Sequence, residues 1–179
     1  MVQAPAIEIT TSASHASSIT MASPEISRLE TRLACPYFMP VTKLENGSWP
    51  HPSRLPLGCG WSGRCTAPGH EQEIPPQNVL EADCNLGYAR TCGWAPQERI
   101  WDAVRFGVQA PVAHHRSDVS DSTARVLRLT YVCERDHCPV EHGSLEFDLG
   151  QSRWVTRHGD DRIQRMAECF LESYLKRRA

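Results

Sequence analysis

Four cysteines in the first half of the chain have a residue type and a spacing that could bind a metal: Cys35, Cys65, Cys84 and Cys92. The gaps between them contain 29, 18 and 7 residues. Four thiolates can close a tetrahedral zinc site, and they can equally hold a 4Fe–4S cluster. We therefore expect the four sulfur atoms to meet at one metal centre.

The spacing of these cysteines bears on which metal they hold. Structural zinc sites usually take their cysteines as close pairs separated by about two to four residues, and every gap here is longer. The compact Cys-x2-Cys runs of bacterial ferredoxins are also missing. A 4Fe–4S cluster tolerates widely separated ligands, because its corners lie further apart than the bonds to a single ion. The spacing thus favours a 4Fe–4S cluster, with Zn²⁺ as the alternative cofactor.

The cellular compartment decides how all eight cysteines are interpreted. Residues 1–21 lack a basic segment followed by an apolar one, so we expect no secretory signal there and predict a cytoplasmic protein. In a reducing compartment disulfides are rare, and cysteine clusters indicate metal or redox chemistry. A disulfide scaffold would be the alternative for an exported protein.

Two cysteines outside the set of four have simple interpretations. Cys59 lies six positions before Cys65 and could replace one of the four as a ligand. Cys169 falls beside the apolar stripe of a predicted C-terminal helix, so we interpret it as a packing residue.

A second site is conceivable around Cys133 and Cys138, which have a Cys-x4-Cys spacing. His137 and His142 lie close by in sequence, and the loop would form a hairpin tip suited to a zinc ion. The simpler interpretation, which we favour, is that Cys133 packs in a sheet and Cys138 is a loop thiol.

No residue pattern predicts catalysis, and binding is favoured over an enzymatic function. Ser62, in Gly-Trp-Ser-Gly, resembles a nucleophile elbow, but no strand before it and no helix after it is predicted. The acidic residues of the predicted hairpin tip are interpreted as solvated charges. The histidines without a patterned partner are His70, His114, His115 and His158.

Overall charge gives no reason to expect nucleic acid or a membrane as partner. The 179 residues carry a net charge of −2 and a pI of about 6.4. Arginines around the cysteines, such as Arg90 and Arg99, alternate with acids such as Glu98 and Asp102, which favours a mixed surface over a nucleic-acid face. No apolar run approaches the roughly 20 residues of a spanning helix.

The first part of the chain is expected to be irregular. Residues 1–24 are rich in Ser, Thr and Ala and predict a disordered tail, and residues 25–179 predict a single metal-binding domain. A short helix is expected between Pro24 and Cys35. The many Pro and Gly residues from Cys35 to Pro76 argue against a helix or a central strand. We therefore expect a metal crosslink to order this segment, with Tyr37, Phe38, Trp49 and Trp61 shielding the site.

Two short helices should complete the cysteine segment, which spans residues 25–108. The first is predicted from about Asn78 to Tyr88 and carries Cys84. The second is predicted from Pro96 to about Phe106, with Pro96 at its first position and an apolar stripe that includes Ile100 and Val104. Cys92 would lie in the link between them.

The last part of the chain, residues 125–179, predicts an antiparallel sheet covered by a helix, after an exposed loop over residues 109–124. Alternating apolar residues predict strands over residues 125–133, 144–149 and 153–157. Apolar residues then recur at helical spacing from Ile163 to Leu175, with Asp160 as the N-cap. The predicted fold class is α+β.

The cysteine motifs resemble those of a group of small acidobacterial-type proteins that carry a four-cysteine metal or iron–sulfur cassette. The matching motifs are Cys35-Pro-Tyr, Arg64-Cys65, Asp83-Cys84-Asn-Leu-Gly-Tyr88 and Thr91-Cys92. The segments Trp49–Leu57 and Tyr131–His137 are also similar, so that the resemblance covers about residues 35–178. It implies metal binding at the four cysteines and implies no particular activity.

The sequence therefore predicts a 4Fe–4S cluster-binding protein whose cluster is structural or transfers electrons. The alternative is a zinc-binding interaction module that docks a protein or nucleic-acid partner.

Overall fold

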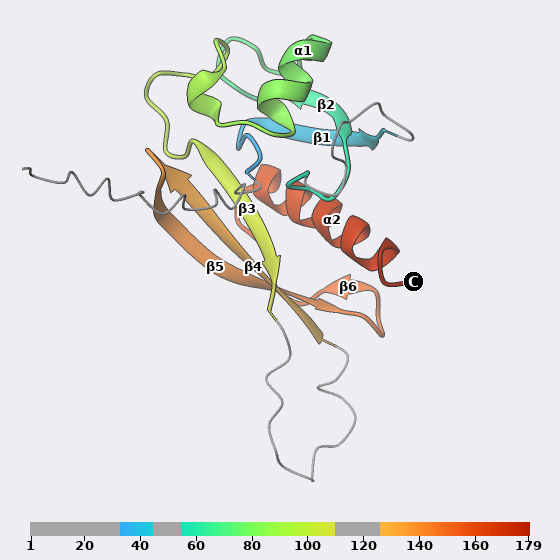
Figure 1. The fold of residues 1–179 in the computed structure, drawn as a ribbon. Coiled ribbons are helices and arrows are strands. Elements are labelled where there is room, and N and C mark those ends of the chain that lie inside the picture. Colours follow the sequence, from blue (N-terminus) through green and yellow to red (C-terminus); the bar gives the residue numbers. More distant parts are fainter. Residues whose placement is uncertain (1–32, 45–54, 110–125) are drawn as a thin grey trace, which may run out of the picture.

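The structure, a computed structural model, describes residues 33–44, 55–109 and 126–179. The predicted tail, the helix after Pro24, Trp49 and the polar loop with His114 and His115 lie outside these residues. The chain has a mixed α and β fold with two antiparallel sheets (Figure 1). In chain order the elements are β1 (Phe38–Lys43), β2 (Trp61–Cys65), α1 (Gln77–Val79), a π-helix (Leu80–Cys84), a 3-10 turn (Ala89–Thr91), β3 (Ala103–Val108), β4 (Val126–Arg135), β5 (Cys138–Asp148), β6 (Arg153–Trp154) and α2 (Asp161–Lys176).

The larger sheet has the strand order β3-β4-β5-β6 with every neighbouring pair antiparallel. The predicted alternation in β4 is confirmed, because Leu129 and Cys133 are buried on its inner face. β4 and β5 are longer than predicted and form one hairpin. β6 is shorter than predicted and contains two residues, although Val155 still donates a hydrogen bond to the Glu146 carbonyl.

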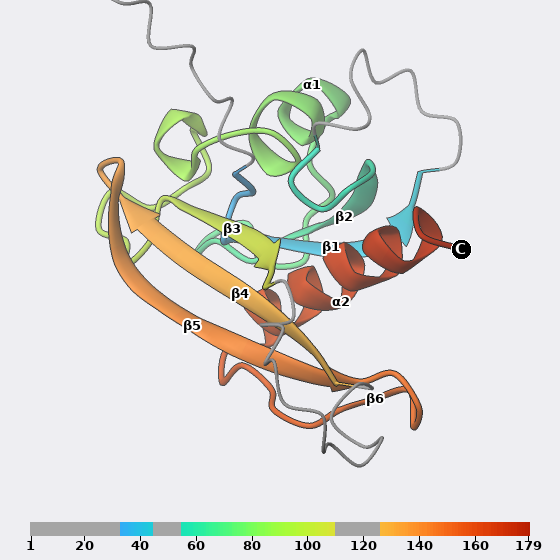
Figure 2. The same ribbon diagram turned by 60° about the horizontal axis from the view of Figure 1, so that its bottom comes forward.

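The C-terminal helix α2 agrees with its prediction. The Asp160 carboxylate accepts a hydrogen bond from the N–H of Arg162, which makes Asp160 the N-cap. The apolar stripe of α2 packs on the larger sheet, where Ala167, Phe170 and Leu171 form a core cluster with Leu129 and Leu145. Figure 2 shows α2 between the larger sheet and the smaller sheet formed by β1 and β2. No helix of the described residues has the length and apolar character needed to cross a membrane.

The smaller sheet shows that the segment Cys35–Pro76, which was expected to be irregular, contains two paired strands, although neither is a central strand. β1 and β2 pair in antiparallel fashion from Phe38 opposite Cys65 to Lys43 opposite Trp61. Pro40 is tolerated inside β1 because both strands of a two-stranded sheet are edges, and a bulge follows it. Trp61, Gly63 and Cys65 are buried along one face of β2. The alternation of side chains that is typical of a strand is therefore present in this segment, although its many Pro and Gly residues obscure the pattern in the sequence.

The prediction of a helix from Pro96 to Phe106 is wrong. Residues 103–108 form strand β3, in which Val104, Phe106 and Val108 lie opposite alternate residues of β4. Ile100, which belonged to the predicted stripe, is 70% exposed. The apolar residues of this segment fit a period of two as well as a period of 3.6, and the available pairing with β4 decides between them.

The helix predicted from Asn78 to Tyr88 is present in a shorter and wider form. One α-turn, α1, passes directly into the π-helix, where the N–H of Asn85 donates to the carbonyl of Leu80. Cys84 is the last residue of this π-helix. Both views of the ribbon place α1 and the π-helix over β1 and β2 (Figures 1 and 2). Insertions of this type inside α-helices often mark functional sites.

Candidate metal centre

Four short chain segments carry the four cysteines, which we call the cysteine set. Cys35 lies in the turn before β1, and Cys65 is the last residue of β2. Cys84 ends the π-helix, and Cys92 directly follows the 3-10 turn. Cys35, Cys65 and Cys84 are buried, whereas Cys92 is partly buried. All eight cysteines of the chain are free thiols.

Backbone hydrogen bonds join the first three segments of the cysteine set. The N–H of Cys35 donates to the carbonyl of Cys84 at 3.3 Å. Past the end of the β1–β2 ladder, the backbone N–H and the hydroxyl of Thr66 both donate to the carbonyl of Tyr37 at 2.8 Å. Cys35 is thus hydrogen-bonded directly to Cys84, and Tyr37, two residues after Cys35, is hydrogen-bonded to Thr66, which follows Cys65.

The segment of Cys92 is attached by side chains rather than by a ladder. The hydroxyl of Thr91 donates to the carboxylate of Asp83 at 2.7 Å, which joins it to the residue before Cys84. On the other side, the Trp94 ring stacks on His70 with ring centres 4.4 Å apart and planes 5° from parallel. His70 lies in the loop that follows Cys65, so the fourth cysteine is flanked by contacts to two of the other three segments.

The thiols of the cysteine set lie close enough to influence one another's charge. The pKa of Cys35 is raised to about 12, chiefly by burial and also by the nearby sulfur atoms of Cys92 and Cys65. Burial raises the pKa of Cys84 well above its ordinary value, and the other three thiols of the set raise it further. The pKa of Cys65 is raised by burial and by Cys92. The four sulfur atoms therefore share one electrostatic neighbourhood.

Backbone N–H groups point at two of these sulfur atoms. The N–H of Ala67 donates to the Cys65 sulfur at 3.4 Å, and the N–H of Tyr37 donates to Cys35 and opposes the rise of its pKa. Such donors stabilise a thiolate relative to a thiol. They are also the type of hydrogen bond that sets the properties of a metal–sulfur centre.

The geometry does not include a preformed site for one ion. Within residues 33–44, 55–109 and 126–179, no group of three or more His, Cys, Asp or Glu side chains is placed so that it could hold a metal ion. The cysteine set is thus assembled in one region, but its sulfur atoms do not surround a single point as four ligands of one ion would.

The other cysteines lie in different surroundings. The sulfur of Cys59 is 3.2 Å from the hydroxyl of Ser173 on α2, near the buried Cys169. Cys133 is fully buried and lies opposite Glu141, whereas Cys138 is exposed and lies opposite Arg135. The packing interpretation of Cys133 and Cys169 agrees with this burial.

Two polar residues have contacts that the sequence did not predict: Glu134, which was interpreted as a solvated charge of the hairpin tip, and His158, for which no partner was predicted. Glu134 is buried and accepts hydrogen bonds from the Tyr88 hydroxyl at 3.0 Å and, as an ion pair at 3.2 Å, from Arg105. The side chain of His158, which is 8% exposed, lies between Glu141, 3.3 Å from its Nε2, and the N–H of Asp160, which donates to its Nδ1 at 2.9 Å. Apart from the local bond from Asp160, these contacts join residues 17 to 46 positions apart, and no local sequence signal predicts such pairs.

Ser62 is the second residue of β2, and its hydroxyl donates to the carbonyl of Thr42. It therefore has neither the strand-to-helix turn nor the free hydroxyl that a nucleophile elbow requires.

Comparison with protein-family models, with curated proteins and with solved structures gives no match to this chain. The assignment of function thus depends on the chemistry of the cysteine set.

Proposed function

We propose that the protein binds a 4Fe–4S cluster through the thiolates of Cys35, Cys65, Cys84 and Cys92. The observation that carries the proposal is the proximity of these thiols, because hydrogen bonds join their four segments and sulfur atoms from other segments raise the pKa of Cys35, Cys65 and Cys84. Burial makes this arrangement unfavourable for four free thiolates, and a cationic centre would compensate their charge.

The residues around the cysteine set suit such a cluster. Four cysteine sulfurs are the usual donors, and the N–H groups of Tyr37 and Ala67 supply hydrogen bonds to two of them. Phe38 and Trp61 are buried in the same core cluster as Cys35 and Cys84, where they exclude water from that side. When bound, the cluster would supply a crosslink among four segments and a centre able to take up or release an electron.

Zinc remains the alternative, as the metal of a module that docks a protein or nucleic-acid partner. The long gaps between the four cysteines, of 29, 18 and 7 residues, support iron and sulfide over zinc, because structural zinc sites usually take their cysteines as close pairs.

The proposal extends to compartment and partners. Thiols for a cluster are retained in a reducing compartment, which supports a cytoplasmic location. If the cluster transfers electrons, the partner is another redox protein.

The experiment that tests the proposal is metal and sulfide analysis of protein purified without oxygen. We expect brown protein with about four iron and four sulfide per chain, the content of one such cluster, and a broad visible absorption band. A colourless protein with one zinc per chain would reject the cluster in favour of the alternative.

Variants test the ligand set. Replacing Cys35, Cys65, Cys84 or Cys92 by Ser should each abolish metal retention. Cys138→Ser is the control for an exposed thiol, and Cys169→Ser is the control for a buried one. Loss of metal from either control, to the same extent as from the other four, would show that the ligands are misassigned.

The structural and electron-transfer roles make different predictions. A structural cluster predicts that its removal by a chelator unfolds the chain, as followed by circular dichroism. An electron-transfer cluster predicts reversible bleaching by dithionite with the fold retained.

A further inference from the structure

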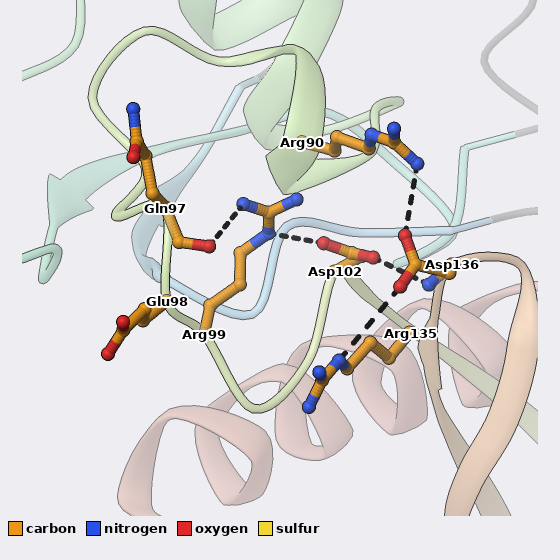
Figure 3. A pocket seen from close by; sticks show the side chains of 7 residues that line it. All are labelled: Arg90, Gln97, Glu98, Arg99, Asp102, Arg135 and Asp136. Atoms are coloured by element: carbon orange, nitrogen blue, oxygen red, sulfur yellow. Dashed lines mark hydrogen bonds and ion pairs between the residues drawn. The ribbon is translucent and has the colours of Figure 1, made fainter.

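A polar cavity of about 690 Å³ lies between the segment of Cys92 and the tip of the β4–β5 hairpin (Figure 3). Its volume is within the range of roughly 300–1,000 Å³ that small-molecule sites occupy. We call it the arginine cavity, because three guanidinium groups from separate segments line it. The lining residues are Arg90, Gln97, Glu98, Arg99, Asp102, Arg135 and Asp136.

A buried ion pair forms the wall of the arginine cavity. The carboxylate of Asp102 is 1% exposed, and it accepts hydrogen bonds from Nε of Arg99 and from the N–H of Asp136. Although burial alone would raise it, the pKa of Asp102 is lowered by these two partners, so the carboxylate is ionised at neutral pH. Asp102 therefore fixes Arg99 and is itself fully engaged.

The remaining bonds of Arg99 leave part of its guanidinium for a ligand. Its Nη1 donates to the backbone carbonyls of Pro96 and Gln97 at 3.0 and 3.3 Å. Nε and Nη1 are thus used within the protein, and no bond from Nη2 is found among the described residues. In Figure 3 the carboxylate of Glu98 points away from the three guanidinium groups. An anion in the cavity would therefore meet a rigid, preorganised cation with little opposition from Glu98.

Asp136 forms ion pairs with the other two arginines, Arg90 and Arg135, and both pairs are exposed to solvent. Arg90 contacts one oxygen of its carboxylate at 3.0 Å, and Nε of Arg135 lies 4.0 Å from the other. The side chains of Arg90, Arg135 and Asp136 are 61%, 59% and 65% exposed, respectively. Exposed ion pairs contribute little net free energy, so a multivalent anion can replace the Asp136 carboxylate on both arginines.

We propose that the arginine cavity binds a small phosphorylated anion of the pyrophosphate class on Arg90, Arg99 and Arg135. The planar guanidinium group matches phosphate oxygens in a two-point arrangement, and two linked phosphates reach more than one arginine. Asp136 is the internal carboxylate that the ligand displaces. This site uses none of the four cysteines, although Arg90 lies two residues before Cys92.

The test is isothermal titration of the full chain with inorganic pyrophosphate at low salt, with folding of each variant checked by circular dichroism. Arg90→Gln and Arg135→Gln should each weaken binding by about tenfold or more, because each removes a charge-assisted bond. Both side chains are exposed, so their replacement should leave the fold intact.

Two further variants make the test specific. Asp136→Asn should tighten binding several-fold, because it releases two arginines from a competing carboxylate; a purely structural Asp136 would give equal or weaker binding. Arg128→Gln is the matched control, since Arg128 is another exposed arginine paired with an acid, Glu146, and its loss should change nothing.

Three results would overturn the proposal: no heat of binding at millimolar pyrophosphate, a loss in Arg128→Gln as large as in Arg90→Gln, or equal or weaker binding by Asp136→Asn. Citrate serves as the carboxylate probe. If citrate binds more tightly than pyrophosphate, the assignment of the ligand to the phosphate class is wrong.

Discussion

The side-chain amide of Asn85 pairs with the backbone of Trp61 as a neighbouring strand would. Its Oδ1 accepts from the N–H of Trp61, and its Nδ2 donates to the carbonyl of the same residue, both at 2.9 Å. Nδ2 also donates to the carbonyl of Leu80 at 3.0 Å. Because Asn85 follows Cys84 and Trp61 begins the strand that ends at Cys65, this pair positions two segments of the cysteine set.

Replacing Asn85 should therefore destabilise the fold strongly. Asn85→Ala would leave buried backbone groups of Trp61 and Leu80 without partners, and each such group costs about 1–3 kcal/mol. We expect the free energy of unfolding to fall by about 2–4 kcal/mol, as measured by urea denaturation. The matched control is Asn78→Ala at an exposed position of α1, which should change stability by less than about 0.5 kcal/mol. Equal losses from the two variants would contradict this role.

Gly63 is required by the close approach of β1 to β2. A Cβ atom at this position would lie 2.2 Å from the carbonyl oxygen of Met39 and 2.7 Å from the ring of Phe38. Because a paired backbone cannot move without breaking the ladder, Gly63→Ala should cost about 1–3 kcal/mol or more of stability. The measurement is the midpoint of thermal unfolding.

Gly93→Ala is the control for this substitution. A Cβ at Gly93 would meet no atom within 4 Å, and the residue is exposed. Its midpoint should stay close to that of the wild type, and a shift as large as that of Gly63→Ala would remove the steric explanation.

The cap of α2 should make stability depend on pH in the acidic range. Burial alone would raise the pKa of Asp160, but hydrogen bonds from Arg162 and its charge lower it below the model-peptide value of 3.8. A carboxyl with a lowered pKa in the folded state contributes stability that is present above the unfolded pKa. That contribution is lost as the pH falls through the folded pKa. We expect denaturant midpoints to decrease between pH 5 and pH 3 partly for this reason.

Two substitutions separate the charge of Asp160 from its capping bond. Asp160→Asn keeps an acceptor for the N–H of Arg162 and should reduce the pH dependence, with a small loss at neutral pH. Asp160→Ala removes the cap as well and should cost about 0.5–2 kcal/mol at pH 7. If Asp160→Asn retained the full pH dependence of the wild type, other carboxylates would be its source.

The elements predicted correctly are those in which one period is repeated without ambiguity. In α2 the apolar residues recur at helical spacing from Ile163 to Leu175, and in β4 apolar residues from Leu127 to Cys133 occupy every second position. Val104 and Val108 of β3, in contrast, fit both periods, and only the partner strand β4 selects one. The sequence of residues 103–108 alone does not show that β4 is available as a partner strand.

Contacts within the protein itself order the first half of the chain. Asn85 pairs with Trp61, β1 pairs with β2, and Ala34 exchanges two backbone hydrogen bonds with Val104. We therefore regard a cluster as an addition to these contacts and not as the single cause of order. The arginine cavity was not predicted, because Arg90 and Asp136 are 46 residues apart and meet only through the fold.

The stack of Trp94 on His70 leads to a prediction about the metal centre. These rings hold the segment of Cys92 against the loop after Cys65, and stacked rings contribute about 0.5–1.5 kcal/mol. Trp94→Ala should therefore speed the loss of the cluster to a chelator by about 2- to 10-fold, as followed by visible absorbance without oxygen. Trp154→Ala is the control, because Trp154 contacts Phe147 in the other core cluster and should leave the rate unchanged.

A double-mutant cycle identifies the stack itself as the cause. In the metal-free protein, the losses of unfolding free energy from His70→Ala and Trp94→Ala should not add, because either substitution removes the same contact. The double variant should thus be more stable than the sum of the two single losses predicts, by about 0.5–1.5 kcal/mol. Strict additivity would mean that the rings do not stabilise each other, and any effect of Trp94→Ala on the cluster would then come from solvent access to Cys92. The two explanations separate further in His70→Phe, which keeps a flat ring under Trp94 and should retain the wild-type rate of cluster loss.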